Sequence, residues 1–418
     1  PGAAPLILNT PFTIIKTIGA PIMELRFEMD EKEALLQFKR EKSNGANEQF
    51  RTMNVVVIIL ESFSAEYSTL LTGKKGYTPF LDSLMQQSLY FSHAYANAKK
   101  SIDGIPAVTS SIPALMPVSY ITSPYSANRT TSIAGLLADE GYTSAFFHGG
   151  NNGTMGFDNF SRISGHQRYF GRSEYGSEDY DGHWGVFDEP FYEFTVKECS
   201  KMKQPFAITF FSLSSHHPYS IPEKLQGRFP KGELPIHESI GYADYALRAF
   251  FKVASKQQWY NNTLFVLTAD HTGPAEHPEF GTRNGVFKIP MVFFIPDGSL
   301  KGESKRTVQQ SDIMPSVLDY LGYKKKWMDF GASVFDSTSL GMAINSTGDL
   351  YQIIRNDTLL QFDGMQSVAV YSLSSDPLMK NNLIENTNST KKELELLIKS
   401  YLIQYQAAMR SNNLTNSK

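Results

Sequence analysis

The chain has 418 residues, of which 41% are hydrophobic, and it carries 39 Lys and Arg residues against 42 Asp and Glu residues. This length and hydrophobic content allow one large domain with an appendage, or two ordinary domains, and they exclude a disordered or fibrous protein. The balanced charge gives no indication of nucleic-acid binding, so any anion-binding site must be local. The single cysteine, Cys199, excludes an internal disulfide framework and a zinc site built from several cysteines.

Residues 1–50 are predicted to form an N-terminal connecting arm. A proline-broken apolar stretch is followed by "MDEKEALLQFKREKSNG", an amphipathic helix that we expect to end at Asn44 and Gly45. No segment reaches the roughly 18 consecutive apolar residues that a membrane helix needs. The sequence begins without Met at "PGAAPLILNTPFTIIKTIG", which favours an ectodomain that is joined to the membrane by an upstream segment absent from this chain.

Residues 51–330 are predicted to form an α/β domain. Apolar runs typical of buried strands alternate with helical patterns; the runs lie at 55–60, 144–149, 206–215, 263–270 and 290–296, and the helical patterns at 78–88, 130–142, 242–257 and 311–323. This alternation indicates a central, mostly parallel sheet flanked by helices. Residues 331–418 instead show alternating runs at 349–373 and one helix at 390–409, which predicts a small C-terminal antiparallel sheet with a terminal helix.

Polar residues follow three of the predicted strands directly. Glu61 follows "VVVIIL", and Asp270 and His271 follow "TLFVLTA". A third strand, in "FAITFFSLSSHHPY", brings His216 and His217 to the same edge. Ligands of parallel sheets bind beyond the carboxyl ends of the strands, although any one of these residues alone could be a helix cap. Carboxylates and neutral imidazole suit Zn, Mn or Mg, so we predict one divalent metal ion at this edge.

A candidate nucleophile lies in "YANAKKSIDGIPAVTSSIPAL". Ser101 follows Lys99 and Lys100 at the expected start of a helix. A bound metal could activate its hydroxyl, and the helix start would favour an anion. Lys99 or Lys100 would add positive charge, and we predict Lys100 to be a substrate-binding residue. The alternative is that Ser101 is only an N-cap, and its segment taken alone favours this second interpretation.

The order of these segments, together with "FFHGGNNGTMGFDNF", "DGHWGVFDEPF" and "QQSDIMPSVLDYLG", resembles the lipoteichoic acid synthase-like (phosphoglycerol transferase) branch of the alkaline phosphatase and sulfatase superfamily. The resemblance covers about residues 50 to 380. It implies an alkaline phosphatase/sulfatase-like fold and a metal-dependent catalytic domain. The metal ligands that it implies are Glu61, Ser101, Asp270 and His271, with Ser101 as the nucleophile, and the substrate-binding residues are His148 and His216.

Two positions depart from the family pattern. The family nucleophile is usually Thr, whereas this chain has Ser101, which keeps the hydroxyl. The family's Trp/Arg substrate segment has no clear match in "GGNNGTMGFDNFSR", where Asn151, Asn152 and Arg162 could replace those contacts, or Arg162 could be a surface charge. Outside the core set, we expect His217 to have a structural or supporting role, and His277 either lines the pocket or lies on a loop.

The resemblance implies a phosphotransferase on the extracytoplasmic face of a bacterial cell membrane. Ser101 would attack a phospholipid with a phosphoglycerol or phosphoethanolamine headgroup, release diacylglycerol and leave a phosphoserine, from which a glycan or polyol acceptor would take the headgroup. His148 or His216 would bind the phosphoryl oxygens or the headgroup, or protonate the leaving oxygen.

Other functions stay open at this point. One alternative is a sulfatase-like phosphoesterase or sulfuric ester hydrolase acting on a soluble ester, since it would share the fold and the metal ligands. The formylglycine signature needs Pro two residues and Arg four residues after the modified residue, and "SIDGI" lacks both. One carboxylate after the first strand favours a single metal over the two of alkaline phosphatases. A third possibility is a catalytically silent paralogue that acts as a binding module. The complete set of Glu61, Ser101, Asp270 and His271 argues against it, because a silent copy has no need of all four residue types.

Overall fold

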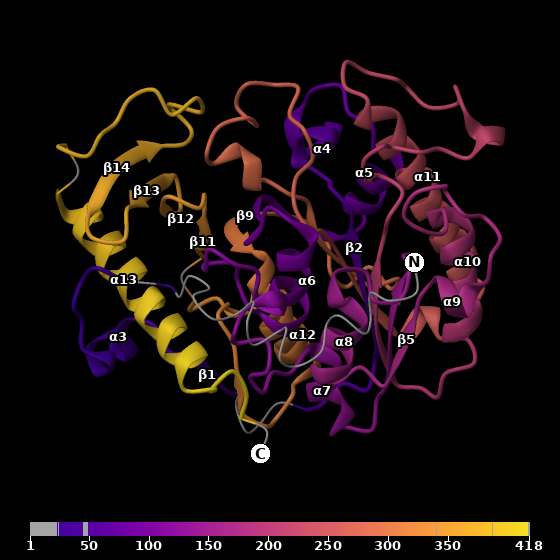
Figure 1. Ribbon diagram of the computed structural model, residues 1–418, viewed down its shortest axis with the longest axis horizontal. Coiled ribbons are helices and arrows are strands. Elements are labelled where there is room, and N and C mark those ends of the chain that lie inside the picture. The colour runs from indigo at the N-terminus through magenta and orange to yellow at the C-terminus, as the bar shows by residue number, and fades with distance from the viewer. Residues whose placement is uncertain (1–22, 24, 45–48, 340, 387, 417–418) are drawn as a thin grey trace.

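The computed structural model describes residues 23, 25–44, 49–339, 341–386 and 388–416, so the first part of the predicted arm lies outside the described residues (Figure 1). The main element is an eight-stranded sheet with the order β5-β4-β6-β2-β7-β8-β3-β9. Its strands are β2 (Asn54–Leu60), β3 (Leu89–Tyr95), β4 (Thr143–His148), β5 (Arg168–Phe170), β6 (Phe206–Phe211), β7 (Thr263–Ala269), β8 (Met291–Phe294) and β9 (Gly302–Gln309). All described neighbours pair in parallel except that β8 runs antiparallel to β7 and β3.

Both faces of this sheet are covered by helices. Alternate residues of β2 point to opposite faces, so Val55, Val57 and Ile59 join one buried cluster, and Val56, Ile58 and Leu60 join the other. Residues of α6 (Ser101–Ser110), α7 (Ile133–Ala138), α8 (Phe157–Ile163) and α12 (Ile313–Leu321) belong to the first cluster. Residues of α5 (Pro79–Met85), α10 (Asp188–Cys199) and α11 (Ile236–Ala254) belong to the second. The predicted α/β fold is therefore confirmed.

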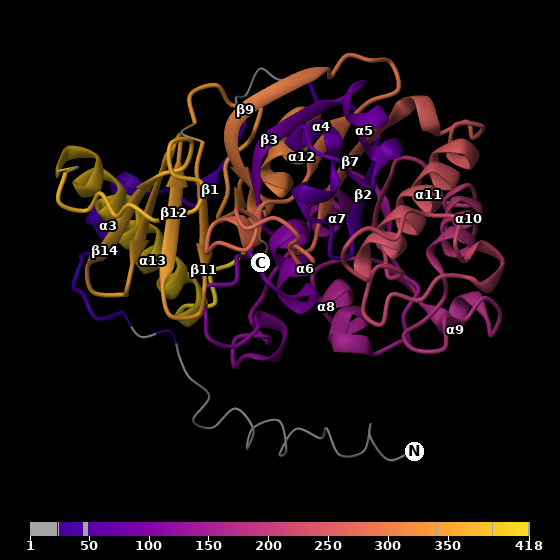
Figure 2. The same ribbon diagram turned by 90° about the horizontal axis from the view of Figure 1, so that it is seen from above.

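The C-terminal unit is also confirmed as a small antiparallel sheet with a terminal helix. Its strands have the order β11 (Ala343–Ser346), β12 (Tyr351–Arg355), β13 (Thr358–Phe362) and β14 (Ser367–Ser372), and α13 (Asn388–Arg410) is the last helix of the described residues. Figures 1 and 2 show this unit at one end of the molecule, while α9 (Arg172–Tyr175), α10 and α11 lie at the other. The division of the chain at residues 50 and 330 stays a prediction.

The helix predicted in the arm is shorter than expected. It forms α3 (Glu31–Gln37), which begins after the capping side chain of Asp30, and it ends at Phe38, whose backbone is extended. The Phe38 ring packs against Tyr401 of α13 with 4.5 Å between centroids. Beyond it, β1 (Glu41–Lys42) pairs with β10 (Trp327–Met328). Tertiary packing therefore overrides the helical pattern of this segment.

Candidate functional site

The first strand of the sheet delivers Glu61 to the carboxyl edge and fixes it there. The backbone N–H of Glu61 donates to Ser212 Oγ at 2.8 Å, and its carbonyl accepts from Ser215 Oγ at 2.5 Å. Both serines follow β6, the neighbouring strand, so the end of β2 is held by side chains of the next loop. The Glu61 side chain is buried, with 1% of its surface exposed, so its carboxylate has little access to bulk water.

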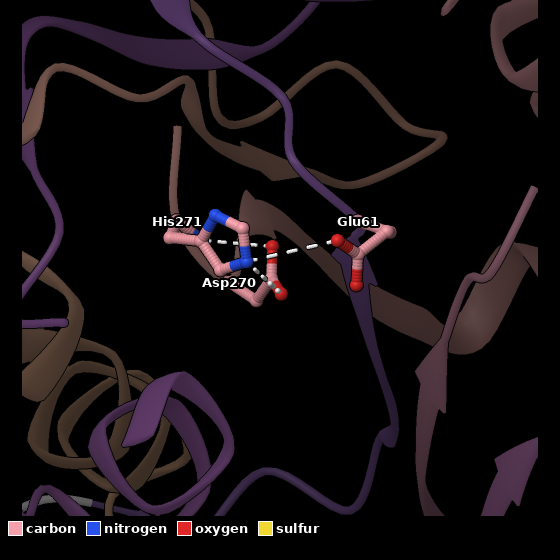
Figure 3. Close-up of side chains that lie close together, drawn as sticks. All are labelled: Glu61, Asp270 and His271. Atoms are coloured by element: carbon pink, nitrogen blue, oxygen red, sulfur yellow. Dashed lines mark hydrogen bonds and ion pairs between the residues drawn. The ribbon is translucent and has the colours of Figure 1, made fainter. Parts of the chain in front are cut away.

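The neighbouring strand β7 places Asp270 and His271 beside Glu61 (Figure 3). Oδ1 of Asp270 accepts hydrogen bonds from the backbone N–H groups of Ser62 at 2.8 Å and His271 at 2.7 Å. Oδ2 of Asp270 is buried and accepts no hydrogen bond, although His271 Nε2 lies 3.2 Å away. One candidate ligand atom from each of Glu61, Asp270 and His271 lies within 4.8 Å of the other two.

The imidazole of His271 is oriented by its own loop. Nδ1 lies 2.8 Å from the carbonyl oxygen of Thr272, and because a carbonyl only accepts, Nδ1 carries the proton. Nε2 therefore faces the cluster, where it lies 3.6 Å from Glu61 Oε1, and in the neutral ring it is the nitrogen that carries the lone pair. A carbonyl that fixes the tautomer of a histidine is typical of metal-binding histidines.

Electrostatics in the cluster favour a bound cation. Burial, and then the nearby Asp270 carboxylate, raise the pKa of Glu61 to about 8. Burial lowers the pKa of His271, but Asp270, Glu61, the Thr272 carbonyl and Asp103 together raise it, so the net shift is upward. Two buried carboxylates repel each other unless a proton or a cation lies between them. The orphaned Asp270 Oδ2 and the mixed oxygen and nitrogen donors both fit a divalent metal ion.

Ser101 lies at this cluster and does not cap its helix. The N-cap residue of α6 is Lys100, with an extended backbone, and Ser101 is the first helical residue. Its hydroxyl lies 3.2 Å from Glu61 Oε2, to which it donates, and 3.4 Å from His271 Nε2. The N–H groups of Asp103 and Gly104 are bonded to the carbonyl of Lys100. The hydroxyl of Ser101 is thus directed to the candidate metal ligands.

The three predicted substrate-binding residues lie around the same edge, but no described hydrogen bond or ion pair connects them to the cluster. His148 ends β4, is buried, and stacks on Phe211 with 4.7 Å between ring centroids. Its Nδ1 donates to the carbonyl of Phe211 at 3.2 Å, and burial lowers the pKa of His148 to about 4. His216 is partly exposed, with Nδ1 2.8 Å from the His217 carbonyl oxygen, and Lys100 is exposed.

Comparisons with known proteins identify the family of this chain. The model of the sulfatase family matches residues 53–323, which is more than half of the chain. The chain belongs to the sulfatase family. Within the part of the chain that the structure describes, no helix is both long and apolar enough to cross a bilayer.

The relatives of this sulfatase-family enzyme include lipoteichoic acid synthases, as the resemblance implied. Lipoteichoic acid synthase 1 of Bacillus subtilis is 25% identical over 308 residues, covering 68% of this chain and 48% of the relative. A lipoteichoic acid synthase of Staphylococcus aureus is 23% identical over 361 residues, covering 78% of this chain and 55% of the relative. The chain thus spans about half the length of these curated relatives.

Solved structures share the fold of this sulfatase-family chain. An alkaline phosphatase superfamily protein from Vibrio parahaemolyticus has a TM-score of 0.82 at 24% identity, covering 94% of this chain and 99% of that one. A lipoteichoic acid synthase from Listeria monocytogenes has a TM-score of 0.76 at 22% identity, covering 93% and 100% of the two chains. These likenesses show the alkaline phosphatase-like fold.

Trp184 contacts His216, one of the predicted substrate-binding residues, although the sequence pattern assigned no role to this tryptophan. Its Nε1 donates to the His217 carbonyl at 2.8 Å, and its ring contacts the His216 ring with 4.3 Å between centroids. The same carbonyl also accepts from His216, so Trp184 helps to hold that imidazole. The only sequence signal was its place in "DGHWGVFDEPF", one of the stretches that carry the resemblance to the family.

The remaining candidates have other partners. Asn151 accepts a hydrogen bond from Arg172 at 3.0 Å, and the Asn152 amide contacts Glu174 at 3.1 Å. Arg162 is exposed in the last turn of α8, which agrees with a surface charge. His277 lies on a loop, where Nδ1 is 2.8 Å from Glu66 Oε1, and the exposed His217 ring contacts Tyr219. Replacement of the family's Trp/Arg contacts by the two asparagines stays untested.

Proposed function

We propose that this enzyme moves a phosphoglycerol or phosphoethanolamine headgroup from a phospholipid to an acceptor hydroxyl of a glycan or polyol. The observation that carries the proposal is the buried Ser101 hydroxyl, 3.2 Å from Glu61 Oε2 and 3.4 Å from His271 Nε2 at the start of α6. A hydroxyl in that position is a nucleophile beside cation ligands, and the adjacent helix start favours an incoming phosphate. The similarity to lipoteichoic acid synthases supports the lipid donor and the polymer acceptor.

The metal ligands in this proposal are Glu61, Ser101, Asp270 and His271. Their donor atoms suit Mn, Mg or Zn, and the unpartnered Asp270 Oδ2 is a buried atom for which a cation would be the missing partner. When bound, the cation would promote ionisation of the Ser101 hydroxyl and offset negative charge on the phosphoryl group.

The reaction has two displacements. Ser101 Oγ forms a bond to phosphorus, the bond from phosphorus to the glycerol oxygen of the lipid breaks, and the serine proton ends on the departing diacylglycerol. The acceptor oxygen then attacks the phosphoserine, and Ser101 Oγ leaves and regains a proton from the acceptor hydroxyl. The first transfer begins with the Ser101 hydroxyl already donating to Glu61 Oε2. With water in place of the acceptor, the same two steps give hydrolysis.

The histidines take different parts in the proposal. Because burial lowers the pKa of His148 to about 4, this ring is neutral at pH 7, and with Nδ1 donating to Phe211 its Nε2 accepts. A neutral acceptor suits a hydroxyl or ammonium of the headgroup and cannot donate a proton to the leaving oxygen. His216 is the partly exposed ring, so we assign to it contact with the departing oxygen, and we assign charge attraction for phosphate to Lys100.

A phospholipid donor requires a membrane surface, and we assign the proposed reaction to the extracytoplasmic face of a bacterial cell membrane. The supporting observation is that the relatives named above are lipoteichoic acid synthases that are about twice as long as the matched part of this chain. Attachment to the membrane would be provided by a segment that is not part of this chain.

The proposal predicts that the purified chain with Mn²⁺ releases diacylglycerol from fluorescently labelled phosphatidylglycerol or phosphatidylethanolamine in mixed micelles. Release should stop with excess chelator and return with added metal, because the nucleophile lies among the metal ligands. The measurement is chromatography of the lipid products, with p-nitrophenyl sulfate and p-nitrophenyl phosphate as soluble comparison substrates. Turnover of a soluble ester without any diacylglycerol release would contradict the lipid donor and favour the hydrolase.

A further inference from the structure

A buried glutamine lies directly behind the cluster, between the two segments that carry Ser101 and Asp270. Gln310 follows β9 and begins the short 3-10 helix Gln310–Asp312, and none of its surface is exposed. It belongs to "QQSDIMPSVLDYLG", a stretch that resembles the family but received no role from the sequence. The parallel pairing of β9 with β3 brings it to the same carboxyl edge as the site.

The amide of Gln310 binds both segments at once. Its Nε2 donates to the carbonyl oxygens of Ala269 and Asp270, each at 2.7 Å, and its Oε1 accepts from the backbone N–H of Asn97 at 2.7 Å. Asn97 lies in the short connection between β3 and α6, which leads to Ser101. One side chain therefore connects the backbone of a metal ligand to the backbone that leads to the nucleophile.

The Asn97 end of this connection is itself held in place. The Asn97 amide nitrogen donates to Gln309 Oε1 at 2.8 Å and to the Ile344 carbonyl at 2.7 Å, and its Oδ1 accepts from the Ser311 N–H at 2.8 Å. The connection between β3 and α6 thus cannot shift without breaking several buried hydrogen bonds, each of which is costly to lose inside a protein.

A close backbone contact gives independent evidence that the two segments are fitted to each other. A Cβ atom on Gly104 would lie 2.5 Å from the carbonyl oxygen of Asp270, so the first turn of α6 packs directly against the metal-ligand segment. The same carbonyl accepts from Gln310. The Asp270 backbone is therefore enclosed by α6 on one side and by the glutamine amide on another.

We propose that Gln310 is a positioning residue that fixes the Ser101 hydroxyl relative to the Asp270 carboxylate. The amide satisfies two carbonyls on one segment and one N–H on the other. Without it, these three buried groups lose a hydrogen bond each, and the segments are expected to separate until water or other groups reach them. A small shift between nucleophile and metal ligands is enough to slow the reaction. The test of this inference by lipid turnover rests on the proposed function, whereas its test by metal affinity does not.

The test is Gln310→Met, which keeps most of the side-chain volume and removes all three hydrogen bonds. Its control is Gln361→Met, which removes a buried amide that donates to Gln352 Oε1 at 2.8 Å in the C-terminal sheet. Calorimetry measures Mn²⁺ affinity, and diacylglycerol release measures lipid turnover. Both measurements are made at a temperature where both variants are folded. We expect Gln310→Met to lose about 10- to 100-fold in Mn²⁺ affinity and in kcat at saturating metal, with KM unchanged.

Equal losses in the Gln361 variant, or a Gln310→Met protein with the parent's Mn²⁺ affinity and kcat, would overturn the positioning role. If Gln310→Met does not fold, Gln310→Asn takes its place, since the shorter amide cannot reach both segments. A parent protein that binds Mn²⁺ but releases no diacylglycerol refutes the proposed function, and the affinity comparison alone then decides the role of Gln310.

Discussion

Replacing Ser101 with alanine is expected to lower lipid turnover on the order of 10³-fold or more, because it removes the atom that forms the bond to phosphorus. The fold should change little. The substitution removes a buried hydroxyl and its hydrogen bond to Glu61, which costs about 0.5–1.5 kcal/mol of the free energy of unfolding. Turnover is measured as diacylglycerol release, and stability as the midpoint of thermal unfolding.

The matched control for this change is Ser110→Ala in the same helix. Ser110 is also buried, and its hydroxyl has no hydrogen-bond partner in the described structure, so its loss should leave turnover near that of the parent. Ser101→Thr should keep part of the rate, because threonine retains the hydroxyl. A Ser101→Ala enzyme that turns over at nearly the parent rate would show that water, and not the serine, attacks phosphorus.

Replacing Asp270 with asparagine is expected to abolish metal binding at Mn²⁺ concentrations that saturate the parent protein. Lipid turnover should be lost with it. Asparagine can still accept from the N–H groups of Ser62 and His271 through one oxygen, so the loop should keep its shape. The change removes a negative charge and the unpartnered Oδ2. Removing a group that only supports a metal ligand lowers metal affinity by roughly 10- to 100-fold. The loss of Mn²⁺ affinity in Asp270→Asn should be larger, because Asp270 is itself a proposed ligand.

Metal content after dialysis and Mn²⁺ calorimetry measure this loss. Asp244→Asn is the control, because Asp244 is also a buried carboxylate that accepts two backbone hydrogen bonds, from Phe80 and Leu81, but it lies on α11 outside the cluster. An Asp270→Asn protein that holds as much metal as the Asp244 variant would contradict the proposed metal centre.

The strand pattern was enough to predict where the candidate ligands lie. Glu61 and Asp270 each follow a seven-residue strand that is buried throughout. The end of such a strand is easy to recognise in a sequence, because the apolar run stops at a polar residue. The edge strand β9 was not predicted, because its first five residues, Gly302 to Arg306, are exposed or half-buried and none is apolar apart from the glycine, and β3 was missed because its burial is mixed. An edge strand has no continuous apolar run from which to recognise it.

The atomic relations inside the site could not be predicted in the same way. The hydroxyl of Ser101 could cap a helix or face a metal ligand, and only the placement of Lys100 as the N-cap separates these possibilities. The orphaned oxygen of Asp270 and the bridge made by Gln310 depend on groups far apart in the chain. Such contacts leave no periodic signal in the sequence, because packing of the whole sheet brings them together.

The central claim, that Ser101 carries the headgroup during the reaction, is tested most directly by mass spectrometry of the enzyme during turnover. The metal-loaded protein is mixed with lipid donor in the absence of an acceptor, quenched in acid and digested. The proposal predicts a peptide containing Ser101 that is heavier by one phosphoglycerol or phosphoethanolamine group, and that loses this mass when acceptor is added before the quench. Steady diacylglycerol release with Ser101 unmodified at every time point, and with no trapped peptide in the Ser101→Thr enzyme, would contradict it.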